Sequence, residues 1–423
     1  MNLADVQAAV GLTTPIRHQL FIDGRFVDAE SGETQVTLNP HDNTPIAEVA
    51  MAGHADIDKA VAAARRAFPV WSRMAAADRG RILLRLAGLI EANTEELARL
   101  ESLDTGHPVR DSRNLDVPRT AACFRYFGGM ADKFQGETIP VEAGFLNYTL
   151  REPVGVVGQV VPWNFPVMFT SWKMGPALAA GNCIVMKPAE ITPLTTLKIA
   201  ELMAEAGVPD GVVNMLPGLG SVAGQYIAEH PEISKIAFTG STATGARIVQ
   251  ASSGNLKKVQ LELGGKGPNI VFEDADLQAA VNGSAWAIFH NQGQACIAGS
   301  RLMLHEKIAD AFLEMFIPLA QSIRLGNPLD NATEMGPLTS AQHRDRVLSY
   351  VEVAKSEGGE VLAGGKSPGG DLSRGCYVEP TVVRAKSYRD RVAQEEVFGP
   401  FVTVLTFKTD EEALQIANGH DYG

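Results

Sequence analysis

A cysteine surrounded by small residues is the first candidate for chemistry in this sequence. Cys296 lies in the run NQGQACIAGSR. Its small neighbours are Gly293, Ala295, Ala298 and Gly299. They would let a substrate and backbone amides approach a thiolate closely, as a nucleophilic cysteine requires. The alternative is a small buried apolar residue, which is what we expect of Cys183 in its apolar run.

A second candidate is a carboxylate at the end of a predicted strand. Glu262 closes the alternating run VQLE just before the Gly264-Gly265 turn. A carboxylate there can point into a cleft, and half-burial would raise its pKa toward that of a general base. The alternative is a solvated strand residue.

A side-chain amide is held between two prolines in PWNFP, residues 162–166. The prolines restrict the chain on either side of Asn164. A rigidly held amide N–H is the kind of donor that a developing oxyanion needs. An ordinary proline-bounded turn would have the same sequence.

Two further segments have features of a nucleotide site. Lys187 and Glu190 lie in MKPAE at the carboxyl end of an apolar run, where ligands bind in doubly wound sheets. Lys187 could donate to ribose hydroxyls. Glu190 could accept from a 2′-hydroxyl and repel a 2′-phosphate, which favours NAD over NADP. Either residue could instead be solvated surface.

The second segment, FTGSTATG, follows a predicted strand and begins a predicted helix. Gly240 permits a tight turn there, and Ser241 or Thr242 can cap the helix. The N-terminal amides of that helix would then bind a pyrophosphate. By itself the pattern is common, because many strand-to-helix turns share it.

A late loop, EEVFGP, could complete such a site. Glu396 could bind a second ribose, and Phe398 offers a flat face for a nicotinamide ring. The alternative is a charged loop with a packed phenylalanine.

Alternating strands and helices are predicted to position these segments. Strands at 183–186, 212–216 and 233–238 are each followed by a helix, which is typical of a parallel sheet covered on both faces. A second alternation follows the Gly-Gly turn, with a helix at 277–290. Nearer the N-terminus, Asp23-Gly24 predicts a hairpin turn between two short strands.

Composition excludes several classes of protein. The chain has 423 residues, which predicts two or three domains, and its net charge of −12 gives no basic surface for nucleic acid or an anionic membrane. Four cysteines without metal-ligand spacing fit a reducing compartment and no metal site. With no signal peptide or membrane span recognised, we expect a cytoplasmic protein.

Together these segments resemble the aldehyde dehydrogenase superfamily. The matching segments, in order, are PWNFP, MKPAE, FTGSTATG, LELGGK, GQACIAGSR and EEVFGP, with 34 positions from Glu262 to Cys296 (296 − 262) as in the family. The resemblance implies an α/β fold with two doubly wound domains and a β-hairpin excursion. Residues 1–135 and 153–262 would bind NAD, residues 136–152 would form a hairpin that reaches into a partner subunit, and residues 263–423 would form the catalytic domain.

The resemblance also implies roles for single residues. Cys296 would attack an aldehyde to give a thiohemiacetal and then a thioester, with Asn164 and the Cys296 backbone N–H forming the oxyanion hole. Glu262 would activate the hydrolytic water, and Lys173 would relay protons behind it. The implied cofactor contacts are Pro162, Trp163, Lys187, Glu190, Gly220, Gly240, Ser241, Thr242, Gly245, Leu263, Glu396 and Phe398. The implied substrate pocket is apolar and consists of Phe165, Phe169, Trp172 and His290, although His290 could equally be a packing residue.

Family chains continue beyond the final ANGHDYG. The missing part would supply the last strand of the subunit sheet, so we expect this polypeptide to be poorly stable, aggregation-prone or weakly active. A homodimer or homotetramer is expected if the C-terminus is complete. The alternative function is a truncated, non-catalytic or nucleotide-binding-only form of the same fold. Glu262 argues for hydrolysis and against a CoA-dependent acylating enzyme.

Overall fold

The structure is a computed structural model that describes residue 6 and residues 11–422. The chain forms two compact units. The first comprises Met1–Leu38, Pro45–Asp104 and Arg110–Glu262; the second comprises Asn39–Thr44, Thr105–Val109 and Leu263–Gly423. The chain therefore enters the second unit twice, briefly, before it forms the body of that unit. Residues 1–5 and 7–10 of the predicted NAD-binding domain, and residue 423, lie outside the described residues.

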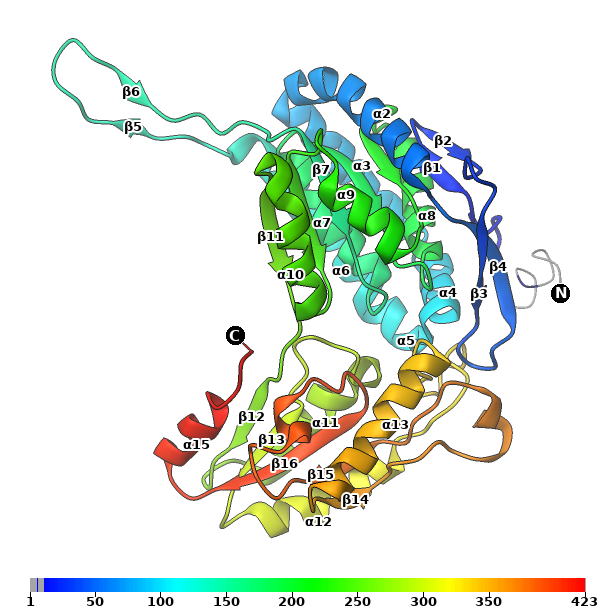
Figure 1. The fold of residues 1–423 in the computed structure, drawn as a ribbon, viewed down its shortest axis with the longest axis vertical. Helices are drawn as coiled ribbons and strands as arrows, with labels where there is room; N and C mark the ends of the chain where they lie inside the picture. The colour runs from blue at the N-terminus through cyan, green and yellow to red at the C-terminus, as the bar shows by residue number, and fades with distance from the viewer. Residues whose placement is uncertain (1–5, 7–10, 423) are drawn as a thin grey trace. The chain divides into compact units, whose positions relative to one another are not determined.

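A seven-stranded sheet forms the centre of the first unit, in the order β11-β10-β7-β8-β9-β1-β2 (Figure 1). Its strands are β1 (Leu20–Ile22), β2 (Arg25–Val27), β7 (Val156–Val160), β8 (Cys183–Lys187), β9 (Val213–Met215), β10 (Lys235–Thr239) and β11 (Lys258–Glu262). The five from β7 to β11 are parallel, and β1 joins β9 antiparallel. The predicted hairpin turn is confirmed, because Asp23 and Gly24 both have positive φ between β1 and β2.

The strand order reverses at β7, which has β8 on one side and β10 on the other. Helices α7 (Pro166–Ala179) and α8 (Leu194–Ala206) lead to β8 and β9, whereas α9 (Gln225–Glu229) and α10 (Thr242–Ala251) lead back to β10 and β11. Right-handed crossovers place these two pairs on opposite faces of the sheet. A crevice at the carboxyl ends of β7 and β10 is the expected ligand site of such a sheet.

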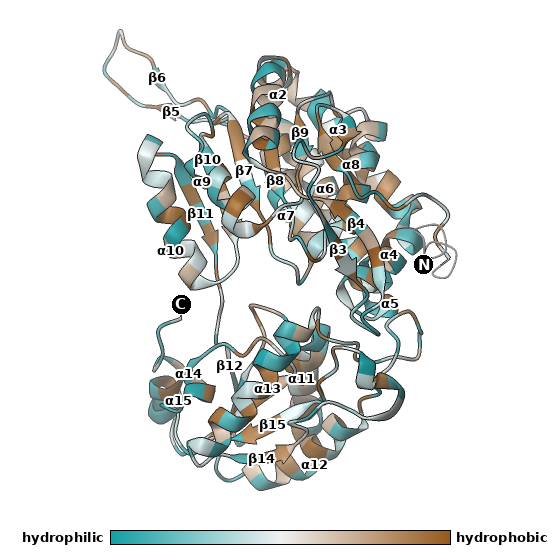
Figure 2. Ribbon diagram, turned by 45° about the vertical axis from the view of Figure 1, so that its right-hand side comes forward, coloured by the Kyte–Doolittle hydropathy of each residue, from teal (hydrophilic) through white to brown (hydrophobic). Residues whose placement is uncertain are grey.

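The central strands β7 and β8 have no exposed face. Every residue of β7 and β8 is buried, and Figure 2 shows the hydrophobic colouring of β7. This burial accounts for the continuous apolar run at 183–186 by which β8 was predicted. Cys183 is fully buried in β8, as expected.

The remaining elements of the first unit surround this sheet. Helix α2 packs on β8, and α3 packs on α6 and α8. These elements are α2 (His54–Arg73), α3 (Ala76–Ala92), α4 (Thr94–Thr105), α5 (Val109–Asp111), α6 (Val117–Met130) and the hairpin β3 (Thr34–Leu38) with β4 (Pro45–Ala50). The β3–β4 hairpin was not predicted from the sequence.

A two-stranded hairpin of β5 (Thr138–Ile139) and β6 (Asn147–Tyr148) projects from the first unit (Figure 1). Its apolar residues are exposed, with Phe145 and Leu146 75% and 76% accessible. The predicted hairpin excursion at 136–152 is therefore present as a local structure.

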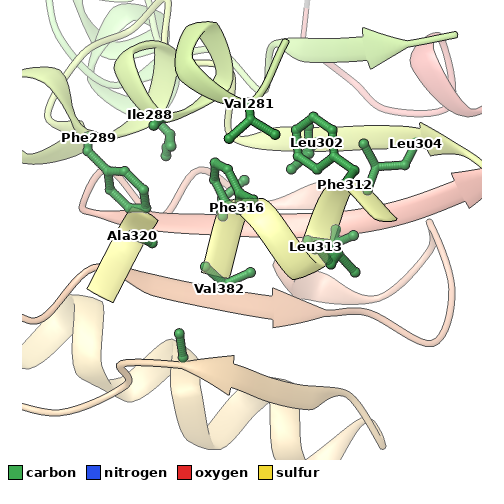
Figure 3. Close-up of a cluster of buried hydrophobic side chains, with 14 of the residues drawn as sticks. Val281, Ile288, Phe289, Leu302, Leu304, Phe312, Leu313, Phe316, Ala320 and Val382 are labelled. Atoms are coloured by element: carbon green, nitrogen blue, oxygen red, sulfur yellow. The ribbon is translucent and has the colours of Figure 1, made fainter. Parts of the chain in front are cut away.

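The second unit contains a five-stranded sheet in the order β12-β13-β16-β15-β14. Its strands are β12 (Pro268–Val271), β13 (Arg301–His305), β14 (Glu360–Ala363), β15 (Thr381–Arg384) and β16 (Phe401–Phe407). All pairs are parallel except β14–β15. Helices α11 (Leu277–Phe289) and α12 (Ala309–Ser322) cover it with a core that includes Phe312, Phe316 and Leu302 (Figure 3).

Three further helices complete the second unit: α13 (Ala341–Ser356), α14 (Arg391–Gln394) and α15 (Asp410–Ala417). A second core cluster joins Val347 and Val351 of α13 to Val383 of β15. No helix within residues 11–422 is long and apolar enough to cross a membrane.

Candidate active site

A cavity of about 350 Å³ lies at the switch point of the first unit. Its walls come from the ends of β7, β8 and β10 and from the first turns of α10. The predicted cofactor residues that line it are Pro162, Trp163, Lys187, Glu190, Gly220, Gly240 and Ser241. Thr242 and Gly245 lie in the first turn of α10 but are not among the lining residues.

Lys187 and Glu190 form an ion pair inside this cavity. The Lys187 ammonium lies 2.9 Å from the Glu190 carboxylate and donates to the Gly218 carbonyl at 3.1 Å. Lys187 is 3% exposed, whereas Glu190 is partly open to the cavity. The pair presents an ammonium and a carboxylate side by side, which are a donor and an acceptor for neighbouring hydroxyl groups.

Ser241 is the N-cap of α10. Its side-chain oxygen accepts from the backbone N–H of Thr244 at 3.3 Å, and the helix begins at Thr242. Of the two predicted N-cap residues, Ser241 and Thr242, Ser241 is therefore the one that caps the helix. Because the N-terminus of α10 faces the cavity, its dipole favours an anion there.

Several residues of this cavity were not predicted, and two of them have long polar side chains. Gln225 of α9 and Arg247 of α10 both line it. Arg247 lies only two positions beyond FTGSTATG, so continuing that motif by one helical turn would have found it. A guanidinium at this position adds positive charge to a site that already suits a phosphate.

These features fit an adenosine diphosphate group. The cavity has the paired charges of Lys187 and Glu190 for a ribose, the α10 N-terminus for phosphates, and apolar walls from Val160 and Ile248 for a base. A Cβ added to Gly220 would meet open space, so the backbone there is accessible to a ligand.

Lys173 and Glu262 are coupled in the first unit. Lys173 is 7% exposed and donates to the Phe238 carbonyl at 3.5 Å. Burial lowers the pKa of Lys173 to about 8, and the negative charge of Glu262 partly opposes that shift. The expected half-burial of Glu262 is wrong: its side chain is exposed, because β11 is an edge strand whose residues alternate between exposed and half-buried.

Asn164 is buried just before α7, and three of the predicted pocket residues follow it, Phe165 as the N-cap of that helix and Phe169 and Trp172 within it. Asn164 is 4% exposed. Phe165 and Phe169 are also buried, and Trp172 is 46% exposed. The rings contact edge to face, with centroids 6.5 Å apart for Phe165–Phe169 and 5.4 Å for Phe169–Trp172. The three form one apolar stripe on α7.

In the second unit, Cys296 is half-buried in an irregular segment between α11 and β13. Three consecutive residues just before it, Asn291, Gln292 and Gly293, have φ of 47°, 54° and 70°. Such a left-handed run costs energy for residues other than glycine, so the surrounding structure must hold it.

Buried amide groups hold that left-handed turn. The Gln292 side chain donates to the Gly106 carbonyl at 3.1 Å, and the Gln294 side chain accepts from the Thr339 backbone N–H at 3.1 Å. A Cβ on Gly293 would lie 1.9 Å from the Gly399 carbonyl oxygen, so only glycine fits there. The turn that leads to Cys296 is thus fixed by segments far away in the sequence.

Three of the predicted motifs meet in this unit. A Cβ on Gly265 would lie 2.6 Å from the Cys296 carbonyl oxygen, so the GGK turn that follows Leu263 packs directly on the cysteine segment. The Glu396 carboxylate accepts from the Gly265 backbone N–H at 2.9 Å. Burial raises the pKa of Glu396, and this hydrogen bond partly offsets the shift.

Phe398 has a left-handed backbone with φ of 65°. The Nε2 of His343 donates to its carbonyl oxygen at 2.6 Å, and burial lowers the pKa of His343 to about 4. The imidazole of His343 is therefore neutral, and its N–H holds the backbone of Phe398 by donating to the carbonyl oxygen. Sequence reasoning missed His343, because nothing near it in the chain indicates this role.

His290 packs against other rings in the second unit. It stacks on Trp286 with centroids 5.0 Å apart and meets the edge of His107 at 5.4 Å. These contacts support the packing role that was left open for this residue.

Comparison with known proteins agrees with the geometry of both units. Residues 26–423 match the model of the aldehyde dehydrogenase family. The chain belongs to this family. A mitochondrial aldehyde dehydrogenase of Mesocricetus auratus is 48% identical over 410 residues, which cover 96% of this chain and 81% of that protein.

Two solved structures have a higher sequence identity to this chain. A putative aldehyde dehydrogenase from Burkholderia cenocepacia is 72% identical with a TM-score of 0.96, over 96% of this chain and 84% of that one. PnpE of Pseudomonas sp. WBC-3, in complex with nicotinamide adenine dinucleotide, is 69% identical with a TM-score of 0.96 over the same shares. The expected aldehyde dehydrogenase fold is confirmed.

The lowered pKa of Lys173 predicts a pH-dependent cost of folding in this aldehyde dehydrogenase. The pKa falls from 10.5 to about 8 on burial, so the charged amine destabilises the fold below pH 8 by up to about 3 kcal/mol. Between pH 8 and 10.5 the folded amine is neutral while the unfolded one is still charged, so stability rises with pH and the cost disappears. We expect Lys173→Met to be more stable than the wild type at pH 7 and to lose that advantage by pH 10.5.

Urea unfolding of both proteins across this range measures the difference. Lys258→Met, at the exposed start of β11, is the matched control and should show no such dependence. An equal effect of Lys173→Met at pH 7 and pH 10.5 would contradict the prediction.

Proposed function

We propose that this protein oxidises an aldehyde to the carboxylic acid with NAD, through a covalent thioester on Cys296. The observation that supports it best is the cavity at the switch point of the first unit, whose ion pair, helix N-terminus and apolar walls fit adenosine diphosphate. The similar PnpE structure is a complex with the same dinucleotide.

The residues of the second unit supply the nucleophile. The Cys296 thiolate attacks the aldehyde carbon and forms a C–S bond, and the carbonyl oxygen becomes an oxyanion. The Asn164 side chain and the Cys296 backbone N–H would stabilise that oxyanion. Negative charge develops on the oxygen in this step, so donors placed here lower the barrier. NAD, when bound, supplies the two-electron acceptor that raises the carbon to the oxidation level of an acid.

The residues at the end of β11 and on α7 release the product. Glu262 takes a proton from water, and the hydroxide attacks the thioester carbon so that the C–S bond breaks and the Cys296 thiolate leaves. Lys173, which interacts electrostatically with Glu262, would accept or return that proton. Its pKa of about 8 suits both directions of transfer near neutral pH.

Further contacts are proposed for the cofactor and the substrate. The residues that line the cavity, with Thr242 and Gly245 in the first turn of α10, would hold the adenosine and diphosphate. Leu263, Glu396 and Phe398 would contact the nicotinamide half. The apolar stripe of Phe165, Phe169 and Trp172 favours aliphatic or aromatic aldehydes.

Product analysis with a panel of aldehydes tests this proposal. We expect the absorbance of NADH to increase at a rate that depends on the aldehyde. One equivalent of carboxylic acid should form for each NADH, and CoA should not be required. NADH formation that requires CoA and yields an acyl-CoA would contradict the hydrolytic mechanism. Absence of NADH formation with every aldehyde would contradict the function.

Glu190 is expected to set the preference for NAD. Its carboxylate would accept from the 2′-hydroxyl of NAD and repel the 2′-phosphate of NADP, whereas the nearby Arg247 attracts that phosphate. We expect Glu190→Gln, which removes only the charge, to lower the ratio of kcat/KM for NAD over NADP by about tenfold. Gln225→Glu in the same cavity is the reverse control and should raise the ratio. An unchanged ratio in Glu190→Gln would refute the role.

We also propose that the β5–β6 hairpin contacts another copy of this chain in a homodimer or homotetramer. The exposed side chains of Phe145, Leu146 and Tyr148 support this, because isolated hairpins rarely expose apolar surface without a partner. A cytoplasmic location stays a prediction that is based on cysteines without disulfides; the curated relatives include mitochondrial proteins.

A further inference from the structure

Helix α4 carries two buried carboxylates that the mechanism does not use. Glu101 and Asp104 lie three positions apart, on one face of the helix. Glu101 is 1% exposed and Asp104 is fully buried. Burial of a carboxylate is costly unless hydrogen bonds compensate for the lost water, so the partners of these groups indicate their purpose.

The Glu101 carboxylate joins two helices. One oxygen accepts from the Val167 backbone N–H of α7 at 3.3 Å, and the other accepts from the Thr195 hydroxyl of α8 at 2.5 Å. Neither helix has a side-chain cap of its own, since their N-cap residues are Phe165 and Pro193. A negative charge at both N-termini therefore replaces the missing caps.

The Asp104 carboxylate caps one of the two helices. It accepts from the Leu194 backbone N–H of α8 at 2.9 Å. Within the described residues Asp104 makes no hydrogen bond to α7, so it differs from Glu101 in the number of helices that it joins. The pair therefore offers a natural comparison between capping one helix and bridging two.

Each of the two bridged helices directly follows a segment of the proposed site. α7 begins two residues after Asn164, and α8 follows the MKPAE segment with Glu190. The segments also touch each other, because the Thr192 hydroxyl donates to the Trp163 carbonyl at 3.3 Å. Glu101 thus lies at the base of a network whose other end is the nucleotide cavity.

We propose that Glu101 is a positioning residue that fixes Asn164 relative to the nucleotide cavity. The proposal rests on the proposed function, which assigns the oxyanion to Asn164 and NAD to the cavity. Because its two oxygens bind different helices, loss of the carboxylate releases both segments together. Loss of Asp104 releases the α8 segment alone.

Hydrogen–deuterium exchange of the NAD-free protein tests the bridge without any turnover. We expect Glu101→Ala to raise exchange in residues 163–170 and 190–197 together, and Asp104→Ala to raise it in 190–197 only. Glu101→Gln should restore most of the protection, because an amide can still accept from Val167 and bond the Thr195 hydroxyl. Increased exchange in only one segment of Glu101→Ala, or across the whole unit, would overturn the proposal.

Kinetics of double variants test the role in positioning. We expect Glu101→Ala to lower kcat by about 10- to 100-fold, the scale of a small misplacement of a catalytic group. The loss should not add to that of Asn164→Ala, because Glu101 acts through Asn164, whereas the loss in Asp104→Ala should add.

The outcomes separate the two proposals. Additive losses for Glu101→Ala and Asn164→Ala in an active enzyme would refute the positioning role and leave the function intact. A wild type without turnover would refute the function, and the exchange pattern would still decide whether Glu101 is the bridge.

Discussion

Cys296→Ala should abolish aldehyde-dependent formation of NADH while NAD still binds. The thiol forms the only covalent bond to the substrate in the proposed mechanism, and removing such a nucleophile typically lowers kcat by 10⁴-fold or more. The cavity that fits the nucleotide lies in the first unit, whereas Cys296 belongs to the second. We therefore expect the dissociation constant for NAD to change by less than about threefold, on the scale of a minor contact.

NADH absorbance and a fluorescence titration with NAD measure the two effects. Cys123→Ala is the matched control, since Cys123 is half-buried beside Gly175 of α7 and has a pKa that burial raises. That variant should keep turnover per folded molecule. Retained turnover in Cys296→Ala would show that the nucleophile lies elsewhere.

Glu262→Gln should stop the reaction after its first half. Without a carboxylate to deprotonate water, the thioester on Cys296 would persist. We expect a burst of about one NADH per active site, followed by a steady rate lower by 10²- to 10⁴-fold, the usual range for loss of a general base. The intact mass of the protein should rise by that of the acyl group.

Rapid mixing and mass spectrometry follow the burst and the acyl adduct. Glu205→Gln, at an exposed position on α8, should behave as the wild type. A Glu262→Gln enzyme that slows without a burst would place Glu262 before thioester formation, which contradicts its proposed role in hydrolysis.

Local pattern and capping predicted most of the parallel sheet in the first unit. Gly207 ends α8 with φ of 90°, and Ser241 caps α10 in the turn where the sequence predicted the start of a helix. These elements are buried on a regular period, so the sequence alone carries their signature. The short, half-exposed strand β14 and the hairpin β3–β4 lack it, and neither was predicted.

The candidate site was predictable where a motif is local and not where contacts are distant. The cavity residues and the segment of Cys296 lie where the motifs indicated. The left-handed turn at Asn291 and Gln292 was not foreseeable, because Gly106 and Thr339 hold it from elsewhere in the chain. The exposure of Glu262 was misjudged although the alternating run VQLE is typical of a strand with one exposed face; that β11 is an edge strand follows only from the order of the sheet.

The early segments 39–44 and 105–109 belong to a unit whose body is made only after residue 262. The Pro40 carbonyl accepts from the Cys376 backbone N–H at 2.9 Å, and the Gly106 carbonyl accepts from the Gln292 side chain at 3.1 Å. At the ordinary rate of synthesis, roughly 5–20 residues per second, Gln292 is added a few seconds after the first unit is complete and Cys376 on the order of ten seconds after it. During that interval the first unit can fold while the two early segments still lack these partners. We therefore expect translation speed and chaperone access to influence the yield of native enzyme.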